Sequence, residues 1–570
     1  MRFFQRIFKK SPPPKGERDF AWLENVNSMD DVSAIEYATQ QLNAVTKNIF
    51  INAQSTDSQY LLALLLADEK IHIIVKRITA HYVNFEHIGA ELNERITNAV
   101  FLYHRQTFLT YVAIIEKLAL LEPLLLTTTL ARAINNATQM IKWRYFNYQS
   151  APANVWLQLS KLLIITEKKS LLGTKIKGYS DPNNADQLSP SLSSAYIHAF
   201  MLGSLESLSF KPQQIELVSK ILAQWSEKIM IENIYDEKKH QFQIDIARDL
   251  PAKRIRNFKP ADHYRYWCFD TINADVGLCI SLIELNISSK QQMIKEVISS
   301  KYALTTLEAL QTEWSRDNYK RQRRNEERIQ VMKPASTAYG FKNTCDQIKQ
   351  YNNIEAQHLE KFHLSDQSLE MQFSSRYAVK SSAEPNNVIY TDFGAERSNV
   401  IDESSKGLGL QISKKTSEVS LGMMVGVSSK ALKYNTKIGV IRGIKPITSI
   451  ELRIGVEVLS NTSFRVGVKN TNLNAARHVS TNQFIDKQRS NTVNAFNLDF
   501  EDSSNHFTCL LLPQQLATSK PETLIFPIIQ YNIDDIFLLK ITDADVPIKL
   551  TGALEQYDNW VRVTFSKNVK

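Results

Sequence analysis

The stretch Ile450-Glu-Leu-Arg-Ile-Gly-Val-Glu-Val458 is rich in β-favouring residues and follows a turn-forming run with Pro446 and Ser449. This composition predicts a short β-strand. Further strand candidates precede it, separated by clusters of Ser, Lys, Asn, Pro and Gly: 407–412, 419–427 and 437–442. Consecutive short strands with tight connections predict a small antiparallel β-barrel in this part of the chain.

A basic segment leads into these strands. The run RDNYKRQRRNEER, residues 316–328, holds six basic and three acidic residues and is followed by the β-favouring Ile329-Gln-Val331. This pattern predicts a linker that feeds a first strand, while a solvated helix end would show the same charges. Tyr319 is its only aromatic residue, so the segment lacks the stacking side chains typical of a nucleic-acid surface. We therefore do not expect nucleic acid as a partner.

The chain before the linker has the periodicity of helices. From about Asp19 to Trp314, apolar residues recur three and four positions apart, as in the series Ile215, Val218, Leu222 and Trp225. This predicts one or two helical domains over residues 19–314. The region contains no repeat of fixed period, so the sequence does not indicate a solenoid. The sequence does not identify the protein partner that such a helical region would bind.

The two ends of the chain differ in character. Residues 1–18 form a basic tail in which aromatic residues precede the run Pro12-Pro-Pro14. Its first ten residues are either a frayed end or a short amphipathic helix that touches a membrane surface or a partner. Residues 471–570 contain further strand candidates, which predict either an extension of the barrel or a second β module: 507–512, 523–529, 536–541 and 560–565.

The composition limits the classes of protein that fit. Of 570 residues, 43% are hydrophobic and 22% are charged, which is typical of globular domains. The net charge of +9 favours anionic partners such as nucleotides. The sequence shows no secretory signal and no apolar run of about 18 to 20 residues, so we expect a cytoplasmic protein without a transmembrane segment. Phosphate-loop, nucleophile-elbow and zinc motifs are absent, so we expect neither an enzyme nor a metal or cofactor site.

Two short motifs carry the chemistry of ligand binding. The first is Arg324-Asn-Glu-Glu-Arg328, an RxxxR pattern, and the second is Asp402-Glu-Ser404-Ser-Lys-Gly407, a DxSxxG pattern. A guanidinium forms bidentate bonds with a phosphate or with the O6/N7 edge of guanine. A carboxylate accepts from guanine N–H groups, a serine hydroxyl donates or accepts, and a glycine permits close approach of the backbone. Together the motifs suit an anionic guanine nucleotide.

In this order, and followed by a run of strands, the motifs resemble those of PilZ domains, bacterial receptors for cyclic di-GMP. The resemblance covers about residues 319–468. It implies that Arg324 and Arg328 contact ligand phosphates and guanine edges, and that Asp402, Ser404 and Gly407 complete the base site. Two further arginines become candidate ligand-binding residues by position: Arg323, beside the first motif, and Arg442, in a later strand.

The combined prediction is a multidomain α + β protein with an all-α helical region followed by a PilZ-like antiparallel barrel and further strands. Its parts are the tail 1–18, the helical region 19–314, the barrel 315–470 with an inserted segment near 339–395 that has helical character, and the strands 471–570. We expect a cytoplasmic cyclic di-GMP receptor that couples nucleotide binding to a partner of the helical region. The alternative is a helical scaffold whose barrel binds no ligand.

Overall fold

The computed structural model describes residues 20, 22–51, 58–85, 88–117, 122–176, 178–179, 190–207, 210–256, 261–316, 319, 328–358, 396–413, 419–428, 436–448, 450–471, 506–514, 521–531, 535–541 and 544–567. The chain forms two compact units, Met1–Arg323 and Arg324–Lys570. We call them the helical unit and the barrel unit and describe each by itself. No helix among the described residues is both long and apolar enough to cross a bilayer.

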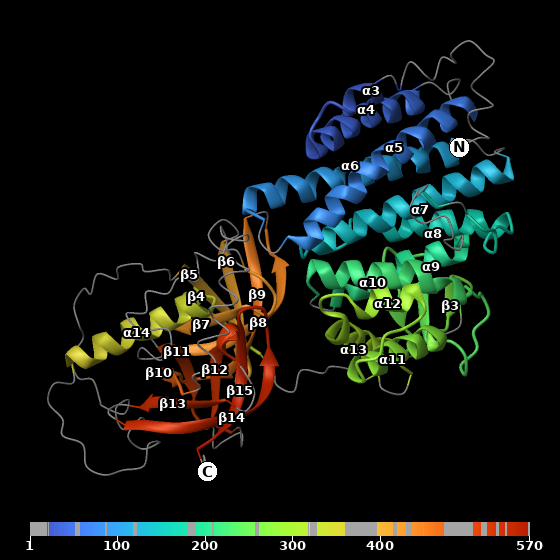
Figure 1. Ribbon diagram of the computed structural model, residues 1–570. Helices are drawn as coiled ribbons and strands as arrows, with labels where there is room; N and C mark the ends of the chain where they lie inside the picture. The colour runs from blue at the N-terminus through green and yellow to red at the C-terminus, as the bar shows by residue number, and fades with distance from the viewer. Residues whose placement is uncertain are drawn as a thin grey trace. The chain divides into compact units, whose positions relative to one another are not determined.

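The helical unit is built from long α-helices that pack side against side (Figure 1). Its larger helices are α4 (Asp31–Ile51), α5 (Ser58–Asn84), α6 (Ala90–Lys117), α7 (Pro123–Phe146), α8 (Val155–Lys168), α9 (Leu192–Gly203), α10 (Pro212–Trp225), α11 (Asp270–Glu284) and α13 (Ala303–Trp314). Shorter helices are α3 (Leu23–Val26), η1 (Ser204–Ser207), η2 (Ser226–Lys228) and α12 (Gln292–Ile298). The sequence prediction of a helical region before the linker is confirmed.

The core of the helical unit is centred on aromatic side chains. Trp143, Trp225, Trp267 and Trp314 are among its largest fully buried residues. Two helices begin at prolines, Pro123 in α7 and Pro212 in α10. An N–H at the first helical position makes no hydrogen bond within the helix, so a proline there costs none. Burial of large aromatic side chains supplies much of the stability of such a unit, at roughly 1.5 to 3 kcal/mol for each side chain.

A small antiparallel sheet lies within the helical unit and was not predicted from the sequence. Its strands are β1 (Phe242–Asp245), β2 (Lys253–Arg254) and β3 (Tyr264–Trp267), in the order β2-β1-β3. Strands of four, two and four residues are too short to show a period of two. β1 is also buried at every position, which removes the alternation of polar and apolar residues.

The barrel unit contains two closed antiparallel barrels. The first has the strand order β4-β5-β6-β9-β8-β7. Its strands are β4 (Ile329–Tyr339), β5 (Glu396–Ser404), β6 (Gly407–Ser413), β7 (Met424–Ser428), β8 (Lys437–Pro446) and β9 (Glu451–Ser460). The predicted antiparallel barrel in this part of the chain is therefore confirmed. Helix α14 (Phe341–His358) follows β4, where the sequence predicted helical character between the two motifs.

The second barrel has the strand order β10-β11-β12-β15-β14-β13. Its strands are β10 (Phe464–Asn470), β11 (His506–Leu512), β12 (Thr523–Pro527), β13 (Ile536–Ile541), β14 (Ala544–Gln556) and β15 (Trp560–Ser566), with η6 (Ile528–Gln530) between β12 and β13. The C-terminal strands thus form a module of their own. The predicted boundary at residue 470 falls at the end of β10, which pairs with β11 and β13 of the second barrel.

The two barrels share an apolar cluster inside the barrel unit. Cys345 and Ile348 of α14 pack with Met424, Ile438, Val440 and Leu459 of the first barrel and with Leu510, Leu512, Ile525 and Trp560 of the second. Figure 1 shows α14 alongside the first barrel, near β4 and β7. Because this cluster contains residues of both barrels, the barrels are held to each other by a common core.

Candidate functional site

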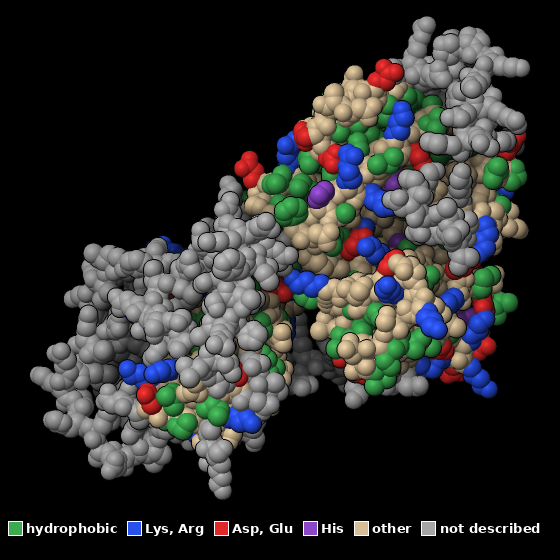
Figure 2. All heavy atoms as spheres, viewed as in Figure 1, with side chains coloured by type: hydrophobic (Ala, Val, Ile, Leu, Met, Phe, Trp, Pro, Cys, Tyr) green, Lys and Arg blue, Asp and Glu red, His purple; other side chains and the backbone are tan. Residues whose placement is uncertain are grey.

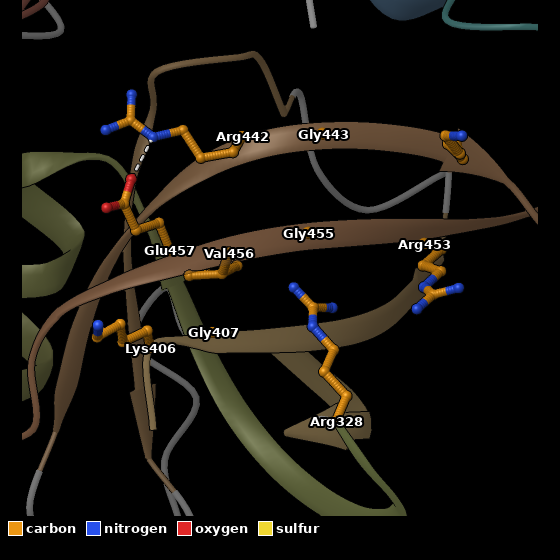
Figure 3. A pocket seen from close by; sticks show the side chains of 10 residues that line it. Arg328, Lys406, Gly407, Arg442, Gly443, Arg453, Gly455, Val456 and Glu457 are labelled. Carbon is orange, nitrogen blue, oxygen red and sulfur yellow. Dashed lines mark hydrogen bonds and ion pairs between the residues drawn. The ribbon is translucent and has the colours of Figure 1, made fainter. Parts of the chain in front are cut away.

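A cavity of about 330 Å³ in the first barrel collects positively charged side chains. It is lined by Arg328, Lys406, Gly407, Arg442, Gly443, Lys445, Arg453, Gly455, Val456 and Glu457. They occupy the last position before β4, the turn before β6, the start of β6, and the strands β8 and β9. Figure 3 labels nine of the ten. The lining residues include five cations and one carboxylate, that of Glu457. The cavity therefore suits an anion.

Asp402 holds two of these arginines in place. Its Oδ1 accepts from Nη1 of Arg328 at 2.5 Å, and its Oδ2 accepts from Nη2 of Arg453 at 2.5 Å. The Asp402 residue is only 1% exposed, whereas the side chains of Arg328 and Arg453 are 21% and 40% exposed. Both carboxylate oxygens are thus occupied by arginines that line the cavity. The geometry supports a positioning role for Asp402, where the sequence suggested direct contact with guanine.

A row of glycines explains why these side chains can meet. Asp402 pairs with Gly409 of β6, Gly409 with Gly455 of β9, and Gly455 with Gly443 of β8. A Cβ at Gly409 would lie 2.3 Å from Oδ2 of Asp402, so only glycine leaves room for the carboxylate. At Gly455 a Cβ would meet no atom closer than 3.8 Å. The cavity floor is therefore bare backbone over Gly455.

Gly407 has a similar steric role at the turn between β5 and β6. A Cβ there would lie 3.1 Å from Nη2 of Arg328 and 3.3 Å from the carbonyl oxygen of Val456. The missing side chain lets the Arg328 guanidinium lie directly over the start of β6. The Ser404 hydroxyl donates to the Gly407 carbonyl oxygen over a long 3.5 Å, and Ser404 does not line the cavity.

The structure brings together several of the residues predicted from the sequence. Arg328, Gly407 and Arg442 line the cavity, and Asp402 lies behind its wall. Arg323 and Arg324 lie outside the described residues.

Three cations of the site were missed from the sequence: Lys406, Lys445 and Arg453. Lys406 could have been predicted from the sequence, because it lies inside the DxSxxG motif itself. Arg453 belongs to the site because β9 pairs with β6 in the register that sets Gln411 opposite Arg453. Strand register of this kind is not visible in the sequence. Within the described part of the chain, neither Lys406 nor Lys445 forms an ion pair with a carboxylate.

Arg442 connects the cavity to the second barrel. Its Nε donates to Oε2 of Glu457 at 2.7 Å, and its Nη2 donates to Oε2 of Glu555 at 3.0 Å. Burial alone would lower the pKa of the Arg442 guanidinium, but Tyr557, Glu457 and Glu555 outweigh this effect and raise it. Burial also raises the pKa of Tyr557 to about 12. Arg442 is thus a permanent cation at the edge of the cavity.

The helical unit has a second cavity, of about 430 Å³, with different chemistry. It lies among α4, α6 and α8, and its charged lining residues are Arg105 and Glu116, which balance each other. Figure 2 likewise shows basic and acidic side chains intermixed over the visible face of this unit. Among the residues that the structure describes, no group of His, Cys, Asp and Glu is arranged to hold a metal ion. The cation-rich cavity is therefore the better candidate for a nucleotide.

Comparison with known proteins finds one family model that matches part of the helical unit. Residues 20–237 match the family model described as "Cyclic-di-GMP receptor FimW, N-terminal domain". No curated protein and no solved structure matches the chain. The match indicates that this part of the chain is similar to a domain of a cyclic di-GMP receptor. It covers helices of the helical unit and none of the barrel strands, so it does not test the PilZ resemblance.

Proposed function

We propose that the protein is a non-enzymatic, cytoplasmic receptor for cyclic di-GMP and that the nucleotide binds in the cation-rich cavity of the first barrel. The observation that carries this proposal is the convergence of Arg328, Lys406, Arg442, Lys445 and Arg453 around a floor of bare backbone. Arginine forks suit phosphodiester oxygens and guanine edges, and lysines add point charges. The family match of the helical unit supports the choice of nucleotide.

The residues in and around the cavity have different roles in the proposed binding. Asp402 fixes one edge of Arg328 and one edge of Arg453, which leaves their remaining N–H donors for the ligand. The bare backbone at Gly455 gives a planar guanine ring a surface without a side chain in the way. Arg324, the first arginine of the RxxxR motif, is a proposed further contact on sequence grounds.

The linker offers a route by which binding reaches the helical unit. The centre of the Tyr319 ring lies 4.2 Å from the Arg254 guanidinium carbon, and the Tyr319 hydroxyl accepts from Nη2 of Arg256 at 2.6 Å. This end of the linker therefore belongs to the helical unit. Arg328, at the other end, is bonded to Asp402 in the barrel. Only residues 320–327 separate the two anchors. A ligand that engages Arg324 and Arg328 therefore acts on a short tether, and we propose that it shifts the populations of the arrangements that a partner of the helical unit distinguishes.

Calorimetric titration of the full chain with cyclic di-GMP tests the proposal. We expect a dissociation constant near micromolar, about −8 kcal/mol, with GTP and cyclic di-AMP binding more weakly. Arg328→Ala and Arg453→Ala should each weaken binding by roughly 1.5 to 3 kcal/mol, the cost of one charge-assisted contact.

Arg397→Ala is the matched control. Arg397 lies on β5, as Asp402 does, but it is exposed and does not line the cavity. Its loss should leave the affinity unchanged. A folded protein that takes up no cyclic di-GMP, or an equal loss of affinity in Arg397→Ala and Arg328→Ala, would overturn the proposed site.

A further inference from the structure

The guanidinium of Arg442 faces two ways. Its Nε is bonded to Glu457, which lines the cavity, and Figure 3 shows this pair at one end of the site. Its other two nitrogens are bonded to the second barrel: Nη2 donates to Glu555, and Nη1 donates to the hydroxyl of Tyr557. A residue that lines the cavity of the first barrel is therefore held from behind by two residues of the second.

The second barrel places Tyr557 with little freedom. Tyr557 stacks on Trp560 with ring centroids 4.5 Å apart. Trp560 is fully buried in the cluster shared by the two barrels, and its Nε1 donates to the carbonyl oxygen of Gly422 at 3.2 Å.

Gly422 completes this contact from the first barrel. It has φ of +79°, and a Cβ there would lie 2.4 Å from the Tyr557 ring. A side chain at position 422 would thus both strain the backbone and displace the ring. The glycine, the tyrosine and the tryptophan together fix the position at which the Tyr557 hydroxyl meets Arg442.

We propose that Glu555 and Tyr557 are positioning residues of the anion site, supplied by the second barrel, and that Glu457 is the resident carboxylate that a ligand phosphate replaces on Arg442. This inference rests on the proposed function and adds the second barrel to it. A guanidinium has five donors on a rigid plane, so it keeps its Nη contacts to the second barrel while its Nε edge changes partner.

Replacement of Glu457 by a phosphate on Arg442 costs free energy and should change the spectroscopic signal of Trp560. A phosphate oxygen that approaches Nε of Arg442 must displace Glu457, whose carboxylate also repels the incoming anion. The guanidinium then shares its charge between the phosphate and Glu555, so the contacts of Tyr557 change strength. Because Tyr557 stacks on Trp560, occupancy of the cavity alters the surroundings of that indole. Trp560 is the only tryptophan after residue 314, which makes it a reporter for this unit.

The test uses the full chain labelled with 5-fluorotryptophan, in which the Trp560 signal is assigned from a Trp560→Phe variant. Cyclic di-GMP and inorganic pyrophosphate are titrated separately, with ¹⁹F spectra and calorimetry recorded for each. We expect both anions to shift the Trp560 resonance. Tyr557→Phe, which keeps the stacked ring and loses the hydroxyl, should weaken binding about threefold to tenfold, as for one neutral hydrogen bond. Glu457→Gln should tighten binding, because the competing charge is gone.

Tyr531→Phe is the matched control, since Tyr531 packs against the core of the second barrel. It should bind both anions as the unmodified protein does. Calorimetric binding with a stationary Trp560 resonance and unchanged affinity in Tyr557→Phe would overturn the inference and leave the proposed function intact. Pyrophosphate binding that depends on Tyr557, without cyclic di-GMP binding, would uphold the inference and overturn the nucleotide. Binding of neither anion would overturn both.

Discussion

Asp68 of the helical unit and Asp402 of the barrel unit are both buried, and they are stabilised in different ways. In the helical unit, Asp68 is 3% exposed and accepts hydrogen bonds from Tyr103 at 3.1 Å and from Tyr111 and Tyr179 at 2.9 Å. In the barrel unit, Asp402 accepts from two arginines instead. The hydrogen-bond donors to Asp68 are neutral hydroxyls, whereas the donors to Asp402 are cations.

The cations near the two aspartates also differ in exposure. Arg132, beside Asp68, is buried: its guanidinium carbon lies 3.4 Å from the centre of the Tyr179 ring, and its Nη2 donates to Glu69. Arg328 and Arg453, by contrast, line a cavity. A buried carboxylate whose partners are also buried contributes to the stability of the unit. A buried carboxylate whose partners line a cavity instead positions cations that can contact a ligand, and the stability of the unit depends less on that carboxylate.

The largest expected effect is therefore on stability in the helical unit. Asp68→Ala leaves three tyrosine hydroxyls without their acceptor and removes a carboxylate near buried Arg132, which we expect to cost about 3 to 5 kcal/mol of unfolding free energy. Asp402→Ala should cost only about 1 to 2 kcal/mol, because both arginines can turn to solvent. Cyclic di-GMP affinity should show the reverse order, with a loss in Asp402→Ala and none in Asp68→Ala.

Denaturant unfolding measures the first quantity with one probe for each unit. Tryptophan fluorescence reports on Asp68→Ala, since every tryptophan except Trp560 lies in the helical unit, and the ¹⁹F resonance of 5-fluorotryptophan at position 560 reports on Asp402→Ala. Calorimetry measures the second. Equal stability losses in the two variants, or loss of nucleotide binding in a folded Asp68→Ala protein, would contradict the distinction between the two aspartates.

Acid should next weaken the helical unit through its buried and half-buried histidines. Burial lowers the pKa of His72 and His198 to about 3 and that of His104 to about 4. Below pH 6.5, the usual histidine value, the unfolded chain binds protons that the folded unit does not, so stability falls as the pH falls from 6.5 toward 4. We expect a loss of about 1 to 3 kcal/mol between pH 6.5 and 5.5.

Asp68 opposes this trend, because burial raises its pKa and stability from that group is lost as the pH rises through the folded value. Glu313 acts in the same direction as Asp68, because burial raises its pKa, whereas burial lowers the pKa of a fourth histidine, His240. We expect the histidines to decide the net sign. Denaturant unfolding at pH 7, 6.5 and 5.5 measures the slope. His198→Gln removes one titrating group and should flatten it, while a stability that rises on acidification would show that the histidines are not the dominant groups.

The sequence predicted the elements of the barrel better than its contacts. The candidates 407–412, 437–442 and 450–458 overlap β6, β8 and β9. Arg328 and Asp402, 74 positions apart, were assigned to one site, and they meet because β4 and β5 are neighbouring strands. Arg453 was missed because its place depends on the pairing register of β9. The contact of Arg442 with Glu555 joins two barrels, which no local pattern reveals.

The buried network of the helical unit was equally hidden. Asp68 and Arg132 fall within long helices, where charged residues ordinarily face solvent. What buries them is the convergence of three helices and of Tyr179, which follows from tertiary packing rather than from the period of any one helix. Sequence patterns thus indicate which segments are helices or strands, while the partners of a buried charge are set by how those segments pack.

The smallest expected effect separates the two glycines that face each other across β6 and β9. Gly409→Ala places a methyl group on the Asp402 carboxylate and should cost about 1 to 3 kcal/mol of stability, as overpacking does. Gly455→Ala places the same methyl group over the cavity floor, where it meets nothing closer than 3.8 Å, so stability should hold within about 1 kcal/mol. Its effect should fall on cyclic di-GMP affinity, with a loss of about fivefold or more if the base lies on that floor. Thermal unfolding and calorimetry of the two variants decide the matter, and unchanged affinity in Gly455→Ala would show that the ligand contacts the cations of the wall and not the backbone between them.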